Sequence, residues 1–186
     1  MYKIALTGGI GTGKTYLSSH FKQMGIPVFY ADNEAKKLYQ DTAFLQRLKT
    51  LLGDAVFTDG QLDFKKMSAL VFNNQEKLEQ LNHLVHPAVM ARFEKWASEQ
   101  GCPTVMMETA ILFEGNLTAY FDKIIVADAP LELRIKRILR RNPELSRNDI
   151  LLRMSHQMSQ EEKCRRADLV VCTGETYCES IDYVRR

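Results

Sequence analysis

The chain has 186 residues, of which 45% are hydrophobic, and its formal net charge is +2 at pH 7. This length and apolar content allow one compact core with insertions, and they argue against a disordered chain. No apolar stretch approaches the roughly 20 residues that span a bilayer, and no signal peptide is visible after Met1. Without either segment, we expect a cytoplasmic protein with no membrane partner, as a monomer or weak homo-oligomer. The balanced charge offers no general case for a nucleic-acid partner.

The first pattern along the chain is a phosphate loop. Residues 8–15 read Gly-Gly-Ile-Gly-Thr-Gly-Lys-Thr and fill every fixed position of the pattern G-x-x-x-x-G-K-[ST]. An apolar run at residues 2–6 predicts a buried strand before the loop, and helical spacing over residues 16–24 predicts a helix after it. Backbone N–H groups of such a loop bind the β- and γ-phosphates of a nucleotide. Lys14 would add a mobile positive charge, and the Thr15 hydroxyl a Mg²⁺ ligand.

Further apolar runs predict the other strands of a parallel sheet. They lie at residues 26–30, 104–107, 123–126 and 169–172, and each adjoins a helical pattern. This alternation predicts an α/β fold in which a P-loop-type parallel sheet carries helices on both faces. Ligands bind at the carboxyl ends of such strands. Polar residues follow the runs there, namely Asp32, Glu108, Asp128 and Thr173.

A long helical insertion separates the second and third strands. Residues 33–100 contain several amphipathic helical stripes and almost no strand signal. We expect breaks at Gly53, at Asp59-Gly60, at Asn73-Asn74 and before Pro87, where His86 is pushed out of helical geometry. The insertion is far larger than a crossover requires, which favours a substrate-binding subdomain. A purely structural helical cap is the alternative.

A second insertion, residues 137–163, has the properties of a lid. Within it, the step Arg140-Arg141-Asn142-Pro143 ends a basic helix, and Ser146 is a suitable N-cap for a helix over residues 148–158. Arg137 and Arg141 share one helix face and could neutralise charge on a transferred phosphoryl group, although a solvated basic face is the alternative. The nucleotide-binding core then comprises residues 1–32, 101–136 and 164–186.

Two carboxylates are candidates for the chemistry. Asp32 follows the second strand, where it could accept a hydrogen bond from an acceptor hydroxyl and take its proton; alternatively, it caps the next helix. Glu108 ends a Walker-B-like strand and could hold Mg²⁺ through water or face the acceptor. The chain lacks the Asn-Lys-x-Asp tetrad that reads guanine, which favours ATP.

Together these residues resemble the dephospho-coenzyme A kinase family of P-loop kinases. The resemblance covers nearly the whole chain, including Leu6-Thr7-Gly8-Gly9-Ile10-Gly11, Ala31-Asp32, His86-Pro87, Leu112-Phe113-Glu114, Arg137 with Arg141, Gln157, Glu162-Lys163 and Ala167-Asp168. It implies ATP-dependent, Mg²⁺-assisted phosphorylation of the ribose 3′-hydroxyl of dephospho-coenzyme A, the last step of coenzyme A synthesis.

The resemblance also implies roles for particular residues. The nucleotide site falls on Gly11, Thr12, Gly13, Lys14, Thr15 and Tyr16, with Thr15 on the metal, and the lid arginines on Arg137 and Arg141. The catalytic carboxylate falls on Asp32, with Lys14 and Arg141 assisting. The helical insertion resembles the coenzyme-A-binding domain, so His86 is a candidate substrate contact, although it could equally pack locally. Glu108, at the end of its strand, is a candidate substrate contact because its longer side chain could reach the acceptor.

Several positions depart from the family pattern. Glu108 replaces a usual Asp, Ala110 a Pro, Arg134 a Gln, Thr173 an Asn and Tyr16 a Thr, and Phe64 stands where an Arg often follows Asp63. These changes affect the acceptor contacts and the adenine edge near Thr173. Two other functions stay open: a kinase of the same fold with another small-molecule acceptor, and an ATP-gated binding or regulatory protein. Cys102, Cys164, Cys172 and Cys178 form no CxxC pair and predict reduced thiols.

Overall fold

The computed structural model describes residues 1–72 and 74–174. They form two compact units, one made of Met1–Tyr30 together with the chain from Gln100 onward, and the other of Ala31–Glu99. None of the helices in the described ranges combines the length and hydropathy that a membrane span requires.

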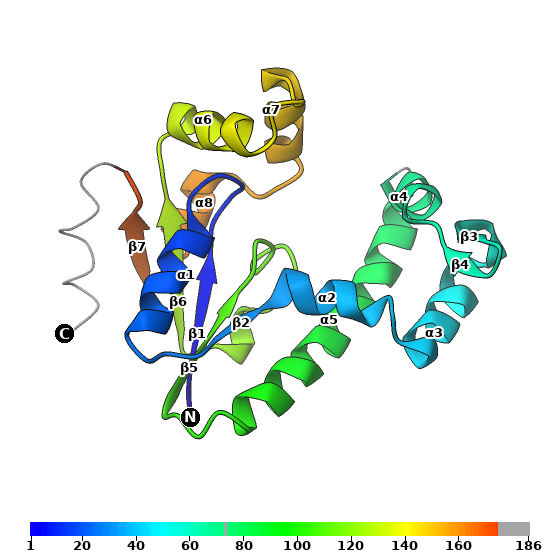
Figure 1. The fold of residues 1–186 in the computed structure, drawn as a ribbon, viewed down its shortest axis with the longest axis horizontal. Coiled ribbons are helices and arrows are strands. Elements are labelled where there is room, and N and C mark those ends of the chain that lie inside the picture. Colours follow the sequence, from blue (N-terminus) through cyan, green and yellow to red (C-terminus); the bar gives the residue numbers. More distant parts are fainter. Residues whose placement is uncertain (73, 175–186) are drawn as a thin grey trace. The chain divides into compact units, whose positions relative to one another are not determined.

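The first unit is built on a five-stranded parallel sheet (Figure 1). Its strands are β1 (Tyr2–Thr7), β2 (Val28–Tyr30), β5 (Thr104–Glu108), β6 (Lys123–Asp128) and β7 (Leu169–Cys172), in the order β2-β5-β1-β6-β7. β1 pairs with β5 on one side and β6 on the other, so that Leu6 lies opposite both Glu108 and Ile125. The predicted α/β fold with a parallel sheet is confirmed.

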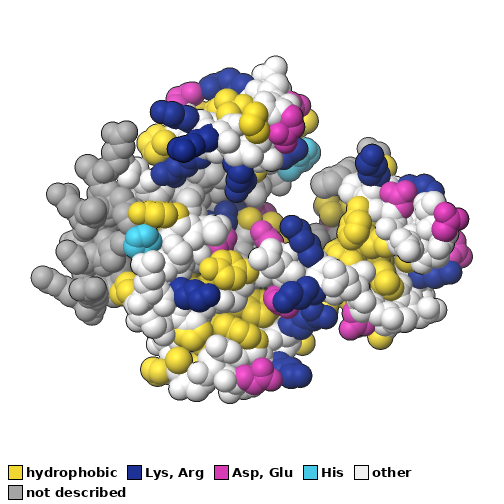
Figure 2. All heavy atoms as spheres, viewed as in Figure 1, with side chains coloured by type: hydrophobic (Ala, Val, Ile, Leu, Met, Phe, Trp, Pro, Cys, Tyr) yellow, Lys and Arg dark blue, Asp and Glu magenta, His cyan; other side chains and the backbone are white. Residues whose placement is uncertain are grey.

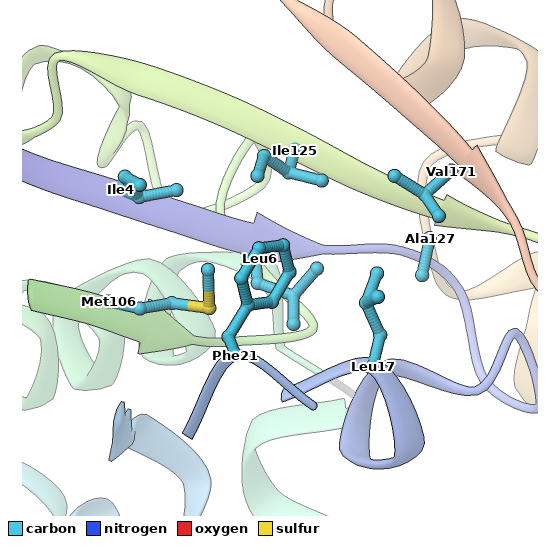
Figure 3. Close-up of a cluster of buried hydrophobic side chains, with 8 residues drawn as sticks. All are labelled: Ile4, Leu6, Leu17, Phe21, Met106, Ile125, Ala127 and Val171. Atoms are coloured by element: carbon cyan, nitrogen blue, oxygen red, sulfur yellow. The ribbon is translucent and has the colours of Figure 1, made fainter. Parts of the chain in front are cut away.

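The sheet is hydrophobic because both of its faces are covered. Figure 3 shows one face, where Leu17 and Phe21 of α1 (Lys14–Gln23) pack on side chains of the strands. The cluster consists of Ile4, Leu6, Leu17, Phe21, Met106, Ile125, Ala127 and Val171, all buried. Burial of this apolar surface holds the phosphate loop between two rigid elements, β1 and α1.

Three more helices complete the described part of the first unit, with a short 3₁₀ turn at Thr118–Tyr120. They are α6 (Leu131–Arg141), α7 (Arg147–Ser155) and α8 (Gln160–Arg165). Ser146 caps α7 as expected: it accepts a hydrogen bond from the N–H of Asp149, and the Asp149 carboxylate accepts one from the N–H of Ser146. The helix ends at Ser155, however, three residues before the predicted end.

The second unit is a helical domain with its own core. It contains α2 (Ala31–Leu38), α3 (Thr42–Leu52), a 3₁₀ turn (Asp54–Val56), the hairpin strands β3 (Phe57–Thr58) and β4 (Gln61–Leu62), α4 (Phe64–Phe72) and α5 (Gln75–Ser98). Its buried residues include Leu48, Leu52, Val56, Met67, Val71 and Leu81. The expected ends at Gly53, at the Asp59-Gly60 turn and at Asn74, which caps α5, are confirmed.

The expected break before Pro87 is wrong. α5 runs without interruption through Pro87, although a proline inside a helix removes one backbone hydrogen bond. Leu81 before the proline and Val89, Met90 and Phe93 after it are all buried. Because helical stability in proteins comes mainly from such tertiary packing, contacts on both sides of Pro87 outweigh the missing bond.

The described cysteines agree with reduced thiols. Cys102, Cys164 and Cys172 are free, and Cys178 lies outside the described residues.

Candidate active site

The phosphate loop follows β1 and leads directly into α1. Gly11 has a φ of +82°, and a Cβ atom there would lie 2.7 Å from the carbonyl oxygen of Arg134. The loop therefore needs glycine at this position both for its left-handed backbone and for its close approach to α6.

A cavity of about 260 Å³ opens beside the loop. Its lining comes from the loop and from one face of α6, namely Gly11, Gly13, Lys14, Thr15, Arg137, Ile138 and Arg141. Figure 2 shows Lys and Arg side chains gathered on the surface that α6 forms. The loop and the arginine pair, predicted separately from the sequence, thus meet at one site suited to a polyanion.

Lys14 lies across its own loop. The Lys14 ammonium donates hydrogen bonds to the carbonyl oxygens of Gly8, at 2.9 Å, and Gly9, at 3.3 Å. Thr12 is buried, and its hydroxyl donates to the Gly9 carbonyl at 2.9 Å. The Thr12 side chain therefore holds the loop together instead of facing the cavity.

Glu108 lies beside the predicted metal ligand. The Thr15 hydroxyl donates to Oε1 of Glu108 at 3.3 Å, and the Ser18 hydroxyl lies 3.0 Å from Oε2. Ser18 is fully buried, so it fixes the carboxylate from the side of α1. Sequence reasoning missed Ser18, because nothing in a helical pattern distinguishes this serine from its neighbour Ser19.

Arg137 and Arg141, which the resemblance assigns to a lid, have different surroundings. The Arg137 guanidinium donates to the Gly11 carbonyl, at 3.4 Å, and to both the hydroxyl, at 2.9 Å, and the carbonyl of Thr173. The Thr173 hydroxyl in turn donates to the Thr12 carbonyl. Arg141 has only a long contact to Asn142, at 3.4 Å, among the hydrogen bonds of the described chain. Arg137 is therefore anchored to the loop, whereas Arg141 is exposed at the cavity edge.

Arg134 is a site residue for which the sequence suggested no role. Its side chain is 7% exposed and donates from Nε to the carbonyl of Ile10 at 3.0 Å. Burial lowers the pKa of Arg134, and the nearby Asp128 opposes that shift. A basic helix pattern cannot separate this inward arginine from the outward ones around it.

Three other predicted residues are not among those that line the cavity. Asp32 is exposed in the first turn of α2, and because Ala31 already opens that helix, the alternative role of Asp32 as its N-cap is wrong. His86 is half-buried within α5, and burial, assisted by His83, lowers its pKa. Both belong to the second unit. Tyr16 is exposed on α1, with its ring 4.5 Å from that of His20.

Oxygen donors near the loop, the Thr15 hydroxyl and the Glu108 carboxylate, suit a magnesium ion that arrives with the nucleotide. Within residues 1–72 and 74–174 no group of three or more His, Cys, Asp or Glu side chains could hold a metal ion. A hydroxyl and a carboxylate beside a phosphate site are the few protein ligands that Mg²⁺ uses.

Comparison with known proteins decides the family. A family model described as Dephospho-CoA kinase matches residues 2–177. The chain belongs to the dephospho-CoA kinase family. Relatives named Dephospho-CoA kinase are 39% identical over 171 residues in Bacteroides fragilis, covering 91% of this chain and 83% of the relative, and 34% identical over 182 residues in Bacillus cereus, covering 95% and 90%.

Solved structures support the same fold. A Thermus thermophilus crystal structure is 31% identical with a TM-score of 0.88, covering 99% of this chain and 95% of that one. A Dephospho-CoA kinase from Campylobacter jejuni is 23% identical with a TM-score of 0.66, covering 98% and 95%. The expected family, P-loop kinase fold and enzyme class are thus confirmed. As a member of this family, the protein uses ATP to phosphorylate dephospho-CoA in the final step of coenzyme A synthesis.

Proposed function

We propose that this protein binds ATP on the phosphate loop and transfers the γ-phosphoryl group to the ribose 3′-hydroxyl of dephospho-CoA, with Asp32 as the general base. The observation that carries the proposal is the cavity in which the loop, Lys14 and two arginines converge, in a chain of this family. Phosphoryl transfer depends mainly on positioning and on electrostatic stabilisation, and those are what these groups supply.

We expect the three cationic side chains of the cavity to contact different parts of the triphosphate. Lys14 lies within the loop, so a triphosphate there would replace the Gly8 and Gly9 carbonyls as its partners. Arg137, held by Thr173, and the exposed Arg141 both line the cavity, so we expect Arg137 to contact the bound nucleotide and Arg141 the transferred phosphoryl group. These three cations would neutralise the charge that develops on the transferred group.

Mg²⁺ bound with ATP would be held by Thr15 directly and by Glu108 through water. The 3.3 Å contact between these two side chains supports this assignment over a role of Glu108 at the acceptor. The ion would supply charge neutralisation at the β- and γ-phosphates.

Asp32 is suited to the base because its carboxylate is available. None of the described residues hydrogen-bonds to it, and it stands in the first turn of α2, where a helix N-terminus stabilises a negative side chain. It lies two residues after β2, at the carboxyl end of the strand, where acceptors bind in this class of fold. His86, on α5 of the helical unit, is proposed as a further acceptor contact.

A coupled ADP-release assay tests the function. With Mg²⁺ and ATP, dephospho-CoA is compared with adenosine, AMP, shikimate and no acceptor, and any product is identified by mass. Release that requires dephospho-CoA and adds one phosphate to it supports the proposal, whereas release with another acceptor contradicts it. Asp32→Asn should lower turnover by about 10² or more with ATP affinity retained, and Asp59→Asn, an exposed hairpin residue, is the matched control.

Both substrates are water-soluble nucleotides. We therefore further propose that the enzyme acts in the cytoplasm, without nucleic acid or membrane, as a monomer or weak homo-oligomer. Size-exclusion chromatography with light scattering over a range of concentrations measures the last point.

A further inference from the structure

Two glutamines far along the chain touch the beginning of the phosphate loop. Oε1 of Gln160 accepts a hydrogen bond from the N–H of Gly9 at 2.9 Å, and Oε1 of Gln157 accepts one from the N–H of Ile10 at 2.9 Å. The partners are separated by 151 and 147 residues in sequence. Gln157 lies after the end of α7, and Gln160 opens α8.

The same stretch of loop is held on its carbonyl side as well. Nε of Arg134 donates to the Ile10 carbonyl at 3.0 Å. The backbone N–H and C=O of Ile10 are therefore both hydrogen-bonded to side chains from outside the loop. The Gln160 amide group is itself oriented, because its Nε2 donates to the Ala127 carbonyl at the end of β6, at 3.0 Å. These contacts hold the first half of the loop before the residues that line the cavity.

The segment that carries the glutamines is anchored in turn. The Met158 N–H, between Gln157 and Gln160, donates to Oε1 of Glu114 at 2.9 Å. The same oxygen accepts from Lys163 at 2.7 Å, and Lys163, with a side chain that is fully buried, also donates to the Ala110 carbonyl at 2.8 Å. A mobile surface loop would not hold two glutamines at fixed positions, but this anchored segment can.

We infer that Gln157 and Gln160 are positioning residues of the nucleotide site: they fix the peptide planes of Gly9 and Ile10 and so set the direction of the loop that follows. Their amide oxygens accept from the N–H groups of Gly9 and Ile10, and the Thr12 N–H donates to the Gly9 carbonyl at 3.3 Å. The N–H groups of Gly11 and Gly13, which line the cavity, are then the ones we expect to bind phosphate. Neutral glutamine suits this place because a carboxylate here would repel a triphosphate. The inference depends on the chain's ATP-dependent kinase family, and not on which acceptor it phosphorylates.

Amide hydrogen exchange, followed by NMR on the full chain, tests the contacts one at a time. Gln157→Met keeps the size of the side chain but removes the acceptor, and it should speed exchange at Ile10 by roughly threefold to tenfold with little change at Gly9. Gln160→Met should do the reverse. Gln157→Glu retains an acceptor oxygen and should restore slow exchange at Ile10. Glu161→Met, an exposed position of α8, should match the wild type at both amides.

ATP affinity, measured by calorimetry without any acceptor, tests the consequence. Each methionine variant should weaken ATP binding by roughly threefold to tenfold while the KM for dephospho-CoA stays within about twofold. Unchanged exchange at both amides, or unchanged ATP affinity in both variants, would overturn the inference. So would a general rise in exchange across the sheet, since that outcome indicates a purely structural role. Failure to phosphorylate dephospho-CoA would contradict the proposed function, but the amide exchange and the ATP affinity could still be measured and would still test this inference.

Discussion

The Thr15 hydroxyl, on α1, donates a hydrogen bond of 3.3 Å to the carboxylate of Glu108, the last residue of β5. The two side chains come from positions 93 residues apart, and the parallel pairing of β1 with β5 brings them together. Glutamate stands here in place of the aspartate that the family resemblance leads one to expect. The contact of Ser18 with the second carboxylate oxygen holds the longer side chain against α1.

The substitution Glu108→Gln should separate the two possible roles of this side chain. The amide would keep an oxygen near Thr15 but lose the charge, so we expect the apparent affinity for Mg²⁺ to fall by roughly tenfold, with the KM for dephospho-CoA little changed. Initial rates over a series of Mg²⁺ concentrations measure this. A normal Mg²⁺ dependence together with a raised KM for the acceptor would instead place Glu108 at the acceptor.

Gly11 and Gly25 form a matched pair for testing the close approach of the loop to α6. Both have left-handed backbones, with φ of +82° and +86°, but a Cβ at Gly25 would meet nothing within 4 Å. Gly25→Ala should therefore cost only the backbone strain, about 1 to 2 kcal/mol of unfolding free energy. Gly11→Ala adds a clash with the Arg134 carbonyl and should also lower turnover on the order of 10². Denaturant unfolding and steady-state rates test both, and equal effects of the two variants on turnover would argue against the prediction.

Lys163→Met should be strongly destabilising. The substitution removes the cation that pairs with the Glu114 carboxylate. One oxygen of that carboxylate, Oε2, already has no hydrogen-bond partner within the described chain. Breaking a fully buried pair costs about 3 to 5 kcal/mol, and because the Glu114 side chain is 24% exposed we expect a loss of about 3 kcal/mol, measured by urea unfolding. Lys136→Met, an exposed site on α6, should stay within about 0.5 kcal/mol of the wild type.

The double variant Lys163→Met with Glu114→Gln completes that test. The neutral amide keeps an acceptor for the Met158 N–H while removing the stranded charge. We expect it to be less destabilised than the sum of the two single variants, by about 1 to 3 kcal/mol. Strictly additive costs would mean that the ion pair itself contributes little.

We expect the half-buried His86 to make the protein less stable on mild acidification. Burial lowers the pKa of His86 in the folded protein, so the unfolded chain takes up a proton first as the pH falls below about 6.5. Stability is therefore complete above that pH and declines as the pH falls through the folded pKa. Melting temperatures at pH 7.5 and 5.0 should differ less in His86→Gln than in the wild type. His156→Gln, at an exposed position, is the control, and equal differences in all three proteins would refute the prediction.

Local patterns in the sequence predicted the strands, most of the helices and the place of the phosphate loop between β1 and α1. Strands, the phosphate loop and the cap at Ser146 depend on short-range properties, namely apolar runs, glycine backbone freedom and side-chain capping, so the residues concerned lie close together in the chain. The same local reasoning failed at Pro87. There the proline disfavours the helix locally, but burial of residues on both sides of it, which sequence periodicity does not weigh, keeps α5 continuous.

The tertiary structure alone decided which polar groups meet. From the sequence, Glu108 could serve either the metal or the acceptor. Arg134 could not be distinguished from the other basic residues of its helix, and Gln157 had no role beyond its place in a family motif. Each contact that defines these residues joins segments more than 90 positions apart. Hydrogen-bond geometry between such segments follows from strand order and helix packing, and no local pattern encodes it.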